Sequence, residues 1–320
     1  MDAFLRQEKV PDEIIIVDDG STDDSRRILE EIKSRSPAVR VFFNDTNKGV
    51  IYSLNRGLEA SSGKYVHLSA ADDWVLPGFF VSALHMLECY PEAALACGEV
   101  NLIRGNAGAR VGVRPIIRPS LKAAYFSPDA VAALLRRSDN WIFTGAAILA
   151  RENVREAGGL LSDLGSFADG FLVRKLAVMH GFCYIPKRVA MWEIFEDSVS
   201  RQTASDPAKA RRTLLNAVAQ FNADPCFPSW YGALFGRRWM FGVSRLAVIA
   251  NPINNAVLSE MGVRNSIDRF VVSSISRLRL WGLQRTLLLA WLWLRFRPFS
   301  PILLFSSLLS RQLERVRKPQ

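Results

Sequence analysis

The chain has 320 residues, of which 49% are hydrophobic and 22% are charged. This is ordinary globular usage and excludes a disordered or fibrous protein. The formal net charge is +10, but it is unevenly spread. Residues 1–200 hold 23 Lys and Arg against 26 Asp and Glu, about −3, whereas residues 201–320 hold 18 against 5, about +13. The shift in composition predicts two regions, 1–205 and 206–320.

The four cysteines are too few and too scattered for a disulfide scaffold, and no Cys-x-x-Cys pair suggests a zinc module. The first residues are charged and lack the apolar core of a secretory signal. We therefore expect reduced cysteines and a cytoplasmic location.

The first 105 residues alternate between strand and helix patterns. Strands are expected at Ile14–Val17, Val39–Phe43, Tyr65–Leu68 and Ala94–Ile103, and helices after a capping box at Ser21-x-x-Asp24, at Val50–Ala60 and at Phe79–Cys89. Because helical spans separate the strands, the pattern predicts an α/β fold with a mostly parallel sheet flanked by helices.

The pattern loosens after residue 105, where three prolines and several arginines indicate a loop. Further elements are expected as a helix at Asp129–Arg137, a strand at Trp141–Ala150, a helix at Phe171–Met179 and short strands at Phe182–Ile185 and Val189–Glu193. From residue 206 onward the sequence predicts a basic, mostly α-helical region.

Two acidic pairs stand where predicted strands end, Asp18–Asp19 and Asp72–Asp73. In an open parallel sheet, ligands bind beyond the carboxyl ends of the strands. Carboxylates gathered there repel one another unless a cation lies between them, and Mg²⁺ takes one or two carboxylates together with substrate phosphates. The pairs thus suggest a metal and a nucleotide diphosphate. The alternative is that each Asp only forms a turn or caps a helix.

Several segments in the same order resemble the family 2 glycosyltransferases, which have the GT-A (Rossmann-like) fold. These segments are VPDEIIIVDDGSTDDS, NDTNKGVIYSLNRGLEASSGKYVHLSAADDWVLPGFF, FTGAAILARENVREAGGL and FADGFLVRKLAVMHGFCYIP, and they cover about residues 5–200. Domains of the family begin with an apolar strand that ends in a Pro-Thr-Tyr-Asn-like segment. This chain starts after that strand, so the resemblance implies an N-terminally truncated domain without its first strand.

The resemblance implies a role for particular residues. Asp19 and Asp18 would contact the base and ribose of the donor nucleotide. Asp72 falls in the family's DxD motif and would meet a Mg²⁺ or Mn²⁺ ion that holds the diphosphate, with Asp73 beside it on the substrate side. Asp169 would be the general base that takes a proton from the acceptor hydroxyl, giving inversion. The alternative for Asp169 is a helix N-cap, a position that would keep its carboxylate ionised.

Two carboxylates of the family pattern are absent, because Ala70 replaces the first Asp of the DxD motif and Ala168 precedes Asp169. Arg201 resembles part of a segment that closes over the diphosphate, with a solvated loop as the alternative. The resemblance therefore implies an inverting, metal-assisted hexosyltransferase that uses a nucleotide-sugar donor. A second hypothesis is a non-catalytic, membrane-associated nucleotide-binding or interaction protein derived from a truncated glycosyltransferase.

The basic region combines arginine with the apolar runs Leu287–Leu294 and Ile302–Leu309. Neither run reaches the roughly 20 apolar residues of a spanning helix. Helices with interleaved Trp, Phe and Arg favour an anionic membrane surface, and the alternative is a subdomain that packs on the catalytic domain. No nucleic-acid-reading motif accompanies the charge, and the sequence does not indicate an oligomeric state. We expect a peripheral protein at the inner membrane face, acting on a polysaccharide, lipopolysaccharide or lipid-linked glycan of the cell envelope.

Overall fold

The computed structural model describes residues 2–104, 110–194, 206–250, 265–278 and 281–317. The chain forms two compact units: Met1–Ala132 with Asn140–Ile194, and Ala133–Asp139 with Phe195–Gln320. The boundary expected at residue 205 falls at the edge of a segment outside the described residues and stays a prediction. Each unit is described by itself.

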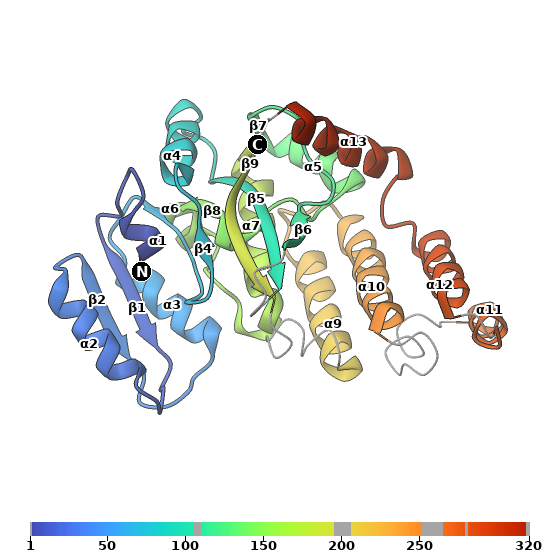
Figure 1. Ribbon diagram of the computed structural model, residues 1–320, viewed down its shortest axis with the longest axis horizontal. Coiled ribbons are helices and arrows are strands. Elements are labelled where there is room, and N and C mark those ends of the chain that lie inside the picture. The colour runs from blue at the N-terminus through green and yellow to red at the C-terminus, as the bar shows by residue number, and fades with distance from the viewer. Residues whose placement is uncertain (1, 105–109, 195–205, 251–264, 279–280, 318–320) are drawn as a thin grey trace. The chain divides into compact units, whose positions relative to one another are not determined.

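The first unit combines helices with short and long strands (Figure 1). Its strands are β1 (Ile14–Asp18), β2 (Val39–Phe43), β3 (Tyr65–Val66), β4 (Trp74–Val75), β5 (Leu95–Arg104), β6 (Arg110–Arg114), β7 (Ala124–Phe126), β8 (Ala147–Ala150) and β9 (Phe182–Ile194). Its helices are α1 (Asp2–Leu5), α2 (Ser25–Arg35), α3 (Val50–Ala60), α4 (Phe79–Cys89), α5 (Pro128–Arg137, which continues into the second unit), α6 (Arg151–Glu156) and α7 (Ala168–His180), with 3-10 helices η1 (Thr144–Ala146) and η2 (Ser162–Phe167). The α/β class is confirmed.

The strands form two sheets of mixed direction. Strands β1 and β2 pair in parallel and make a sheet of two, while β3-β8-β5-β9-β4 form the path of a seven-stranded sheet, with β6 on β5 and β7 on β9. In the larger sheet only β5 and β9 run parallel, and the other described pairs are antiparallel. The expectation of a mostly parallel sheet is therefore wrong. The antiparallel strands β6, β7 and β8 come from the part of the chain after residue 105, where no βαβ repeat was expected.

Several predicted elements agree closely with the structure and others do not. Helices α3 and α4 begin and end where the sequence predicts. The predicted capping box is wrong, because the N-cap Asp24 of α2 makes no side-chain cap hydrogen bond. Strands β6 and β7 were expected as loop. Two predicted strands at the end of the unit are one continuous β9.

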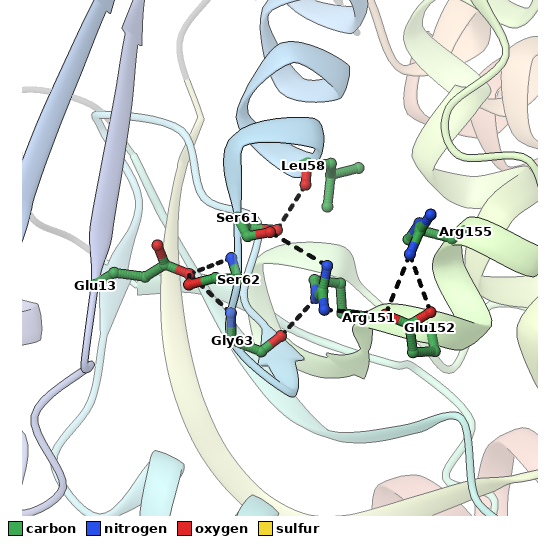
Figure 2. A network of polar contacts seen from close by, with 8 residues as sticks. All are labelled: Glu13, Leu58, Ser61, Ser62, Gly63, Arg151, Glu152 and Arg155. Carbon is green, nitrogen blue, oxygen red and sulfur yellow. Dashed lines mark hydrogen bonds and ion pairs between the residues drawn. The ribbon is translucent and has the colours of Figure 1, made fainter.

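A polar network holds the small sheet to the large one (Figure 2). Glu13, just before β1, accepts hydrogen bonds from the backbone N–H groups of Ser62 and Gly63 at 2.6 and 2.8 Å. From the other side, Arg151 at the end of β8 donates to the Gly63 carbonyl oxygen at 2.7 Å and to the Ser61 carbonyl oxygen at 3.3 Å. The Ser61–Gly63 turn between α3 and β3 is thus fixed by one residue from each sheet.

The core of the first unit lies around β5, β9 and helix α4. Phe79 and Leu87 on α4 are buried with Ala96, Val100 and Ile185 from the two parallel strands. Strand residues with both faces covered explain why Ala94–Ile103 is almost wholly apolar. Burial of this apolar surface fixes the strand ends that carry the candidate site.

One polar cluster lies inside this core. Glu99 on β5 accepts hydrogen bonds from Arg118 at 2.5 Å and from the Tyr184 hydroxyl at 2.9 Å. Burial, followed by the neighbouring Glu99 carboxylate, raises the pKa of Tyr184, so its hydroxyl stays a donor. The cluster gives the buried Glu99 carboxylate its hydrogen-bond partners and joins β5 to β9.

The second unit is helical, as the sequence predicts. Its helices are α9 (Pro207–Ala223), α10 (Tyr231–Ala250), α11 (Ser266–Ser276), α12 (Trp281–Phe296) and α13 (Pro301–Arg317). Helix α10 packs between α9 and α12, and α11 packs on α12 (Figure 1). The Arg238 guanidinium lies 3.1 Å from Asp139, which also accepts a 3.3 Å bond from the Tyr231 hydroxyl, so α10 is tied to the end of α5.

Candidate functional site

The first acidic pair lies at the end of β1 and is held by the protein. Asp18 is buried, and its carboxylate accepts a hydrogen bond from the Ser21 N–H at 3.2 Å. The Asp19 carboxylate accepts three short bonds, from the Asn44 side-chain amide at 2.7 Å and from the N–H groups of Lys48 and Gly49 at 2.9 Å each. Burial opposes ionisation of Asp19, but these bonds prevail and lower its pKa. Asp19 therefore anchors the loop that leads into α3.

Asn44 is a site residue that sequence reasoning missed. It directly follows β2 and is buried. Its amide also donates to the Ser53 hydroxyl at 2.9 Å, and its oxygen accepts from Arg56 at 2.5 Å. Its position in the sequence could have indicated this role, because Asn44 directly follows β2 and Asp18 is the last residue of β1. Both strands pair in register up to Asp18 and Phe43, so the two polar ends meet at one edge.

The second acidic pair lies in the loop between β3 and β4. Asp72 is exposed and Asp73 is half-buried. Burial, together with the negative charges of Asp72 and Asp169, raises the pKa of Asp73 to about 6. The contribution of both neighbours to this shift indicates that Asp72 and Asp169 lie near Asp73, although Asp169 is far away in the sequence.

A tight contact at η1 brings the two sides of this cluster together. A Cβ atom at Gly145 would lie 3.0 Å from Asp73 Oδ2 and would press on the carboxylate. The adjacent Thr144 hydroxyl donates a 3.0 Å hydrogen bond to Asp169. The segment Thr144–Gly145 thus positions both Asp73 and Asp169. Neither residue was singled out from the sequence.

Asp169 lies in the first turn of α7 but is not its N-cap, which is Phe167. Its carboxylate accepts bonds from Thr144 and from the Gly170 N–H at 2.6 Å. Burial raises the pKa of Asp169, and the two hydrogen bonds and Arg174 counteract only part of this effect. The N-cap alternative for Asp169 is therefore wrong, because Phe167 holds that position, and burial rather than helix placement sets the direction of its pKa shift. A carboxylate with a raised pKa is a better base near neutral pH.

Metal binding requires donors that suit a hard cation. Among the residues that the structure describes, no group of three or more His, Cys, Asp and Glu is arranged to hold a metal ion. Asp72 and Asp73 nonetheless fit an ion that takes its remaining ligands from phosphates and water, as Mg²⁺ does. The crowding that raises the pKa of Asp73 is relieved by a cation. A bound ion at these two residues would neutralise charge on a leaving diphosphate.

The structure therefore brings Asp72, Asp73 and Asp169 to one place. Asp18 and Asp19 lie at the end of the two-stranded sheet, where Asn44 and the loop to α3 occupy much of their hydrogen-bonding capacity. Arg201 lies outside the described residues.

Carboxylates gathered at the strand ends of an α/β domain are typical of sites that bind an anionic ligand through a cation. Residues 1–141 match the sequence profile described as "Glycosyl transferase family 2". Over these residues the chain is similar to that family, and the GT-A fold expected from the sequence is confirmed.

Curated relatives match parts of the chain. The uncharacterized glycosyltransferase YibD of Escherichia coli (strain K12) is 37% identical over 86 residues, which are 27% of this chain and 25% of that protein. The uncharacterized protein Rv1520 of Mycobacterium tuberculosis is 34% identical over 155 residues, 48% of this chain and 42% of that protein. The chain spans about a quarter of the length of the first curated relatives it matches.

Solved structures share the fold at low sequence identity. The fragment 1-349 of S. aureus TarS superposes with a TM-score of 0.58 at 14% identity, covering 91% of this chain and 85% of that one. The mannosyltransferase PcManGT from Pyrobaculum calidifontis, in complex with GDP-Man and Mn²⁺, superposes with a TM-score of 0.52 at 16% identity, covering 91% and 79%. At these identities the likeness shows the fold alone.

Proposed function

We propose that this protein is an inverting glycosyltransferase that moves a sugar from a nucleotide-diphosphate donor to a hydroxyl acceptor. The observation that carries the proposal is the convergence of Asp73 and Asp169 on Thr144–Gly145, with Asp72 next to Asp73, in a chain that matches family 2. Asp72 and Asp73 suit the binding of a diphosphate with its cation, and Asp169 suits the role of a general base. The likeness in fold to TarS in complex with UDP-GlcNAc and to PcManGT with GDP-Man and Mn²⁺ supports a nucleotide-sugar donor.

On the donor side, Asp72 is the proposed ligand for Mg²⁺ or Mn²⁺, with Asp73 beside it. The bound ion supplies charge neutralisation to the diphosphate as it leaves. Asp18, Asp19 and Arg201 are proposed contacts to the donor, the first two to its base and ribose and the third to its phosphates. The hydrogen bonds already made by Asp19 leave it mainly a positioning role for the loop Asn44–Gly49.

On the acceptor side, Asp169 is the proposed general base. In a single displacement the acceptor oxygen attacks the anomeric carbon, the bond from that carbon to the phosphate oxygen breaks, and the acceptor proton passes to Asp169. The configuration at the anomeric carbon inverts because attack and departure occur on opposite faces. Burial of Asp169 raises its pKa and makes it a stronger base than an exposed Asp, while Thr144 orients its carboxylate.

The acceptor proposed is the hydroxyl of a polysaccharide, lipopolysaccharide or lipid-linked glycan made at the cytoplasmic face of a membrane. The support for this is the basic and apolar composition of residues 206–320. The second candidate, a non-catalytic nucleotide-binding protein, is favoured by Ala70 and Ala168, which remove two carboxylates from the family's pattern.

Calorimetric titration with UDP and GDP, with and without Mn²⁺, tests the donor side of the proposal. We expect one nucleotide to bind with Mn²⁺ and to bind at least about tenfold more weakly to Asp72→Ala. The matched control is Asp12→Ala, which removes an exposed Asp of the same unit. Binding that needs no metal and ignores Asp72→Ala would contradict the metal–diphosphate role. Mn²⁺-dependent binding without sugar transfer to any acceptor would favour the second candidate.

A further inference from the structure

Helix α13 is inverted with respect to the usual pattern of a water-soluble helix. A surface helix normally turns its apolar residues inward and its charged residues outward. On α13, Ser307 and Arg311 are buried, with 5% and 7% of their surface exposed. On the opposite face, Ile302 is 78% exposed and Phe305 is 68% exposed. Water is a poor solvent for that face.

The exposed residues of α13 form a continuous stripe. Ile302, Phe305 and Leu309 follow one another at intervals of three and four residues, and Leu308 adjoins them at 48% exposure. This spacing places the four side chains on one face of the helix. A contiguous exposed apolar patch of this kind marks a surface that binds a partner or a membrane.

The outward face of α12 has the same character. This helix buries a stripe at every fourth residue, which includes Leu288 and Leu292. Its outward face carries Leu283, Leu287 and Leu294, which are between 38% and 57% exposed. The apolar surface therefore continues on the helix that precedes α13 along the chain.

The charges along these helices are mostly positive. Between residues 265 and 317, from α11 to the end of α13, the sequence holds nine arginines and two acids, Asp268 and Glu314. Asp268 is buried and forms an ion pair with Arg295 at 3.0 Å. Arg269, Arg277 and Arg297 are exposed. On α11, Ile267 and Phe270 are 63% and 73% exposed beside these charges. Apolar side chains next to exposed arginines complement an anionic lipid surface.

The geometry suits a helix that lies on the membrane. Among the described residues, no single helix has the length and apolar character needed to cross a bilayer. Helices α12 and α13 pass that test only as a pair, and they are bent by 119° at the break between them. Arg297 and two prolines stand in or next to this break. We propose that the exposed apolar face of α11, α12 and α13 seats this protein in the headgroup region of an anionic bilayer, with the exposed arginines against the lipid phosphates.

Sedimentation of the full chain with vesicles tests this inference. One set contains phosphatidylcholine alone, and the other contains phosphatidylglycerol as about a third of the lipid. We expect binding to the anionic vesicles that weakens at high salt. The double variant Ile302→Ser/Phe305→Ser should bind at least about tenfold more weakly, because each large side chain loses its burial in lipid. The control is Leu121→Ser, which removes another strongly exposed apolar side chain (63%) from the first unit and should bind like wild type.

Two further measurements keep the outcome clear. Circular dichroism should show unchanged helix content in the double variant, since both changed side chains point to solvent. Light scattering after gel filtration gives the oligomeric state without lipid. Failure of the wild type to bind anionic vesicles would overturn the inference, and so would equal binding by the double variant. A dimer that the double variant converts to a monomer, together with no vesicle binding, would assign this face to a second copy of the chain.

Discussion

Replacing Asp73 with Asn should stabilise the protein at neutral pH. The pKa of Asp73 is about 6 in the folded chain, because burial and the charges of Asp72 and Asp169 disfavour its ionised form. In the unfolded chain an Asp titrates near 3.9. A group whose folded pKa is raised binds its proton more tightly when folded, so folding stability falls as the pH rises from about 4 to about 6. Above that window the ionised Asp73 opposes folding.

The magnitude follows from the two pKa values. A difference of about 2 corresponds to roughly 3 kcal/mol, and partial access of water reduces it to about 2 kcal/mol. Asp73→Asn should therefore raise the free energy of unfolding by about 2 kcal/mol at about pH 7.5, and the gain should shrink toward zero near pH 4. Asn keeps an oxygen that can accept the long 3.5 Å bond from the Ala70 N–H.

Urea denaturation followed by tryptophan fluorescence, in the presence of a chelator, measures this difference. Asp12→Asn is the matched control, because the Asp12 side chain is 90% exposed and its loss should change stability by less than about 0.5 kcal/mol. A loss of stability in Asp73→Asn that is equal at both pH values would refute the reasoning. Asp73 would then be an ordinary turn residue without crowded charge.

Three other changes test the frame around the site. Gly145→Ala should lower the free energy of unfolding by about 1 kcal/mol and weaken donor binding, because its Cβ would press on Asp73 Oδ2. The control is Gly57→Ala, inside α3 with ordinary contacts, which should raise the free energy of unfolding by roughly 0.5–1 kcal/mol. Glu13→Gln should lower the free energy of unfolding by about 1–2 kcal/mol at neutral pH, since Glu13 joins the two sheets. The loss should shrink as the pH falls below the ordinary Glu value of about 4.3 and vanish below the lowered pKa of folded Glu13, where the wild-type carboxylate is protonated as well. Burial lowers the pKa of His67, so the wild type should lose stability below about pH 6.5 more steeply than His67→Phe. Thermal melts at several pH values measure this difference. An equal dependence of the melting temperature on pH in both proteins would rule out a buried neutral His67.

Sequence patterns predicted the strands and helices whose formation depends on residues close together in the chain. The β-branched run at Ile14–Val17 is a strand, and Phe79–Cys89 is a helix with one buried face. Strand pairing was not available in the same way, because β7 and β5 both pair with β9, which lies far along the chain from either of them. Nothing in a short window of sequence indicates such a partner.

The candidate site was predicted only in part, for a similar reason. The resemblance to family 2 singled out Asp72 and Asp169, but the contacts that position the cluster come from Thr144 and Gly145. Their roles depend on η1 lying against the β3–β4 loop and the first turn of α7, which no spacing in the sequence encodes. Asn44 was missed because an Asn after a strand usually reads as a turn former. The exposed apolar face of α13 could not be predicted, because composition alone does not say which side of a helix faces solvent. The structure identifies that side, since Ser307 and Arg311 are buried on the other one.

The central claim is that Asp169 acts as the base in sugar transfer from a nucleotide donor. Its most direct test is the rate of nucleoside diphosphate release from UDP-GlcNAc and GDP-Man, with Mn²⁺ and a membrane glycolipid extract as acceptor, in wild type and Asp169→Asn. The account predicts that Asp169→Asn binds the donor as wild type does but transfers sugar slower by a factor on the order of 10²–10⁴. A variant that transfers at the wild-type rate, or that loses donor binding together with transfer, would contradict it.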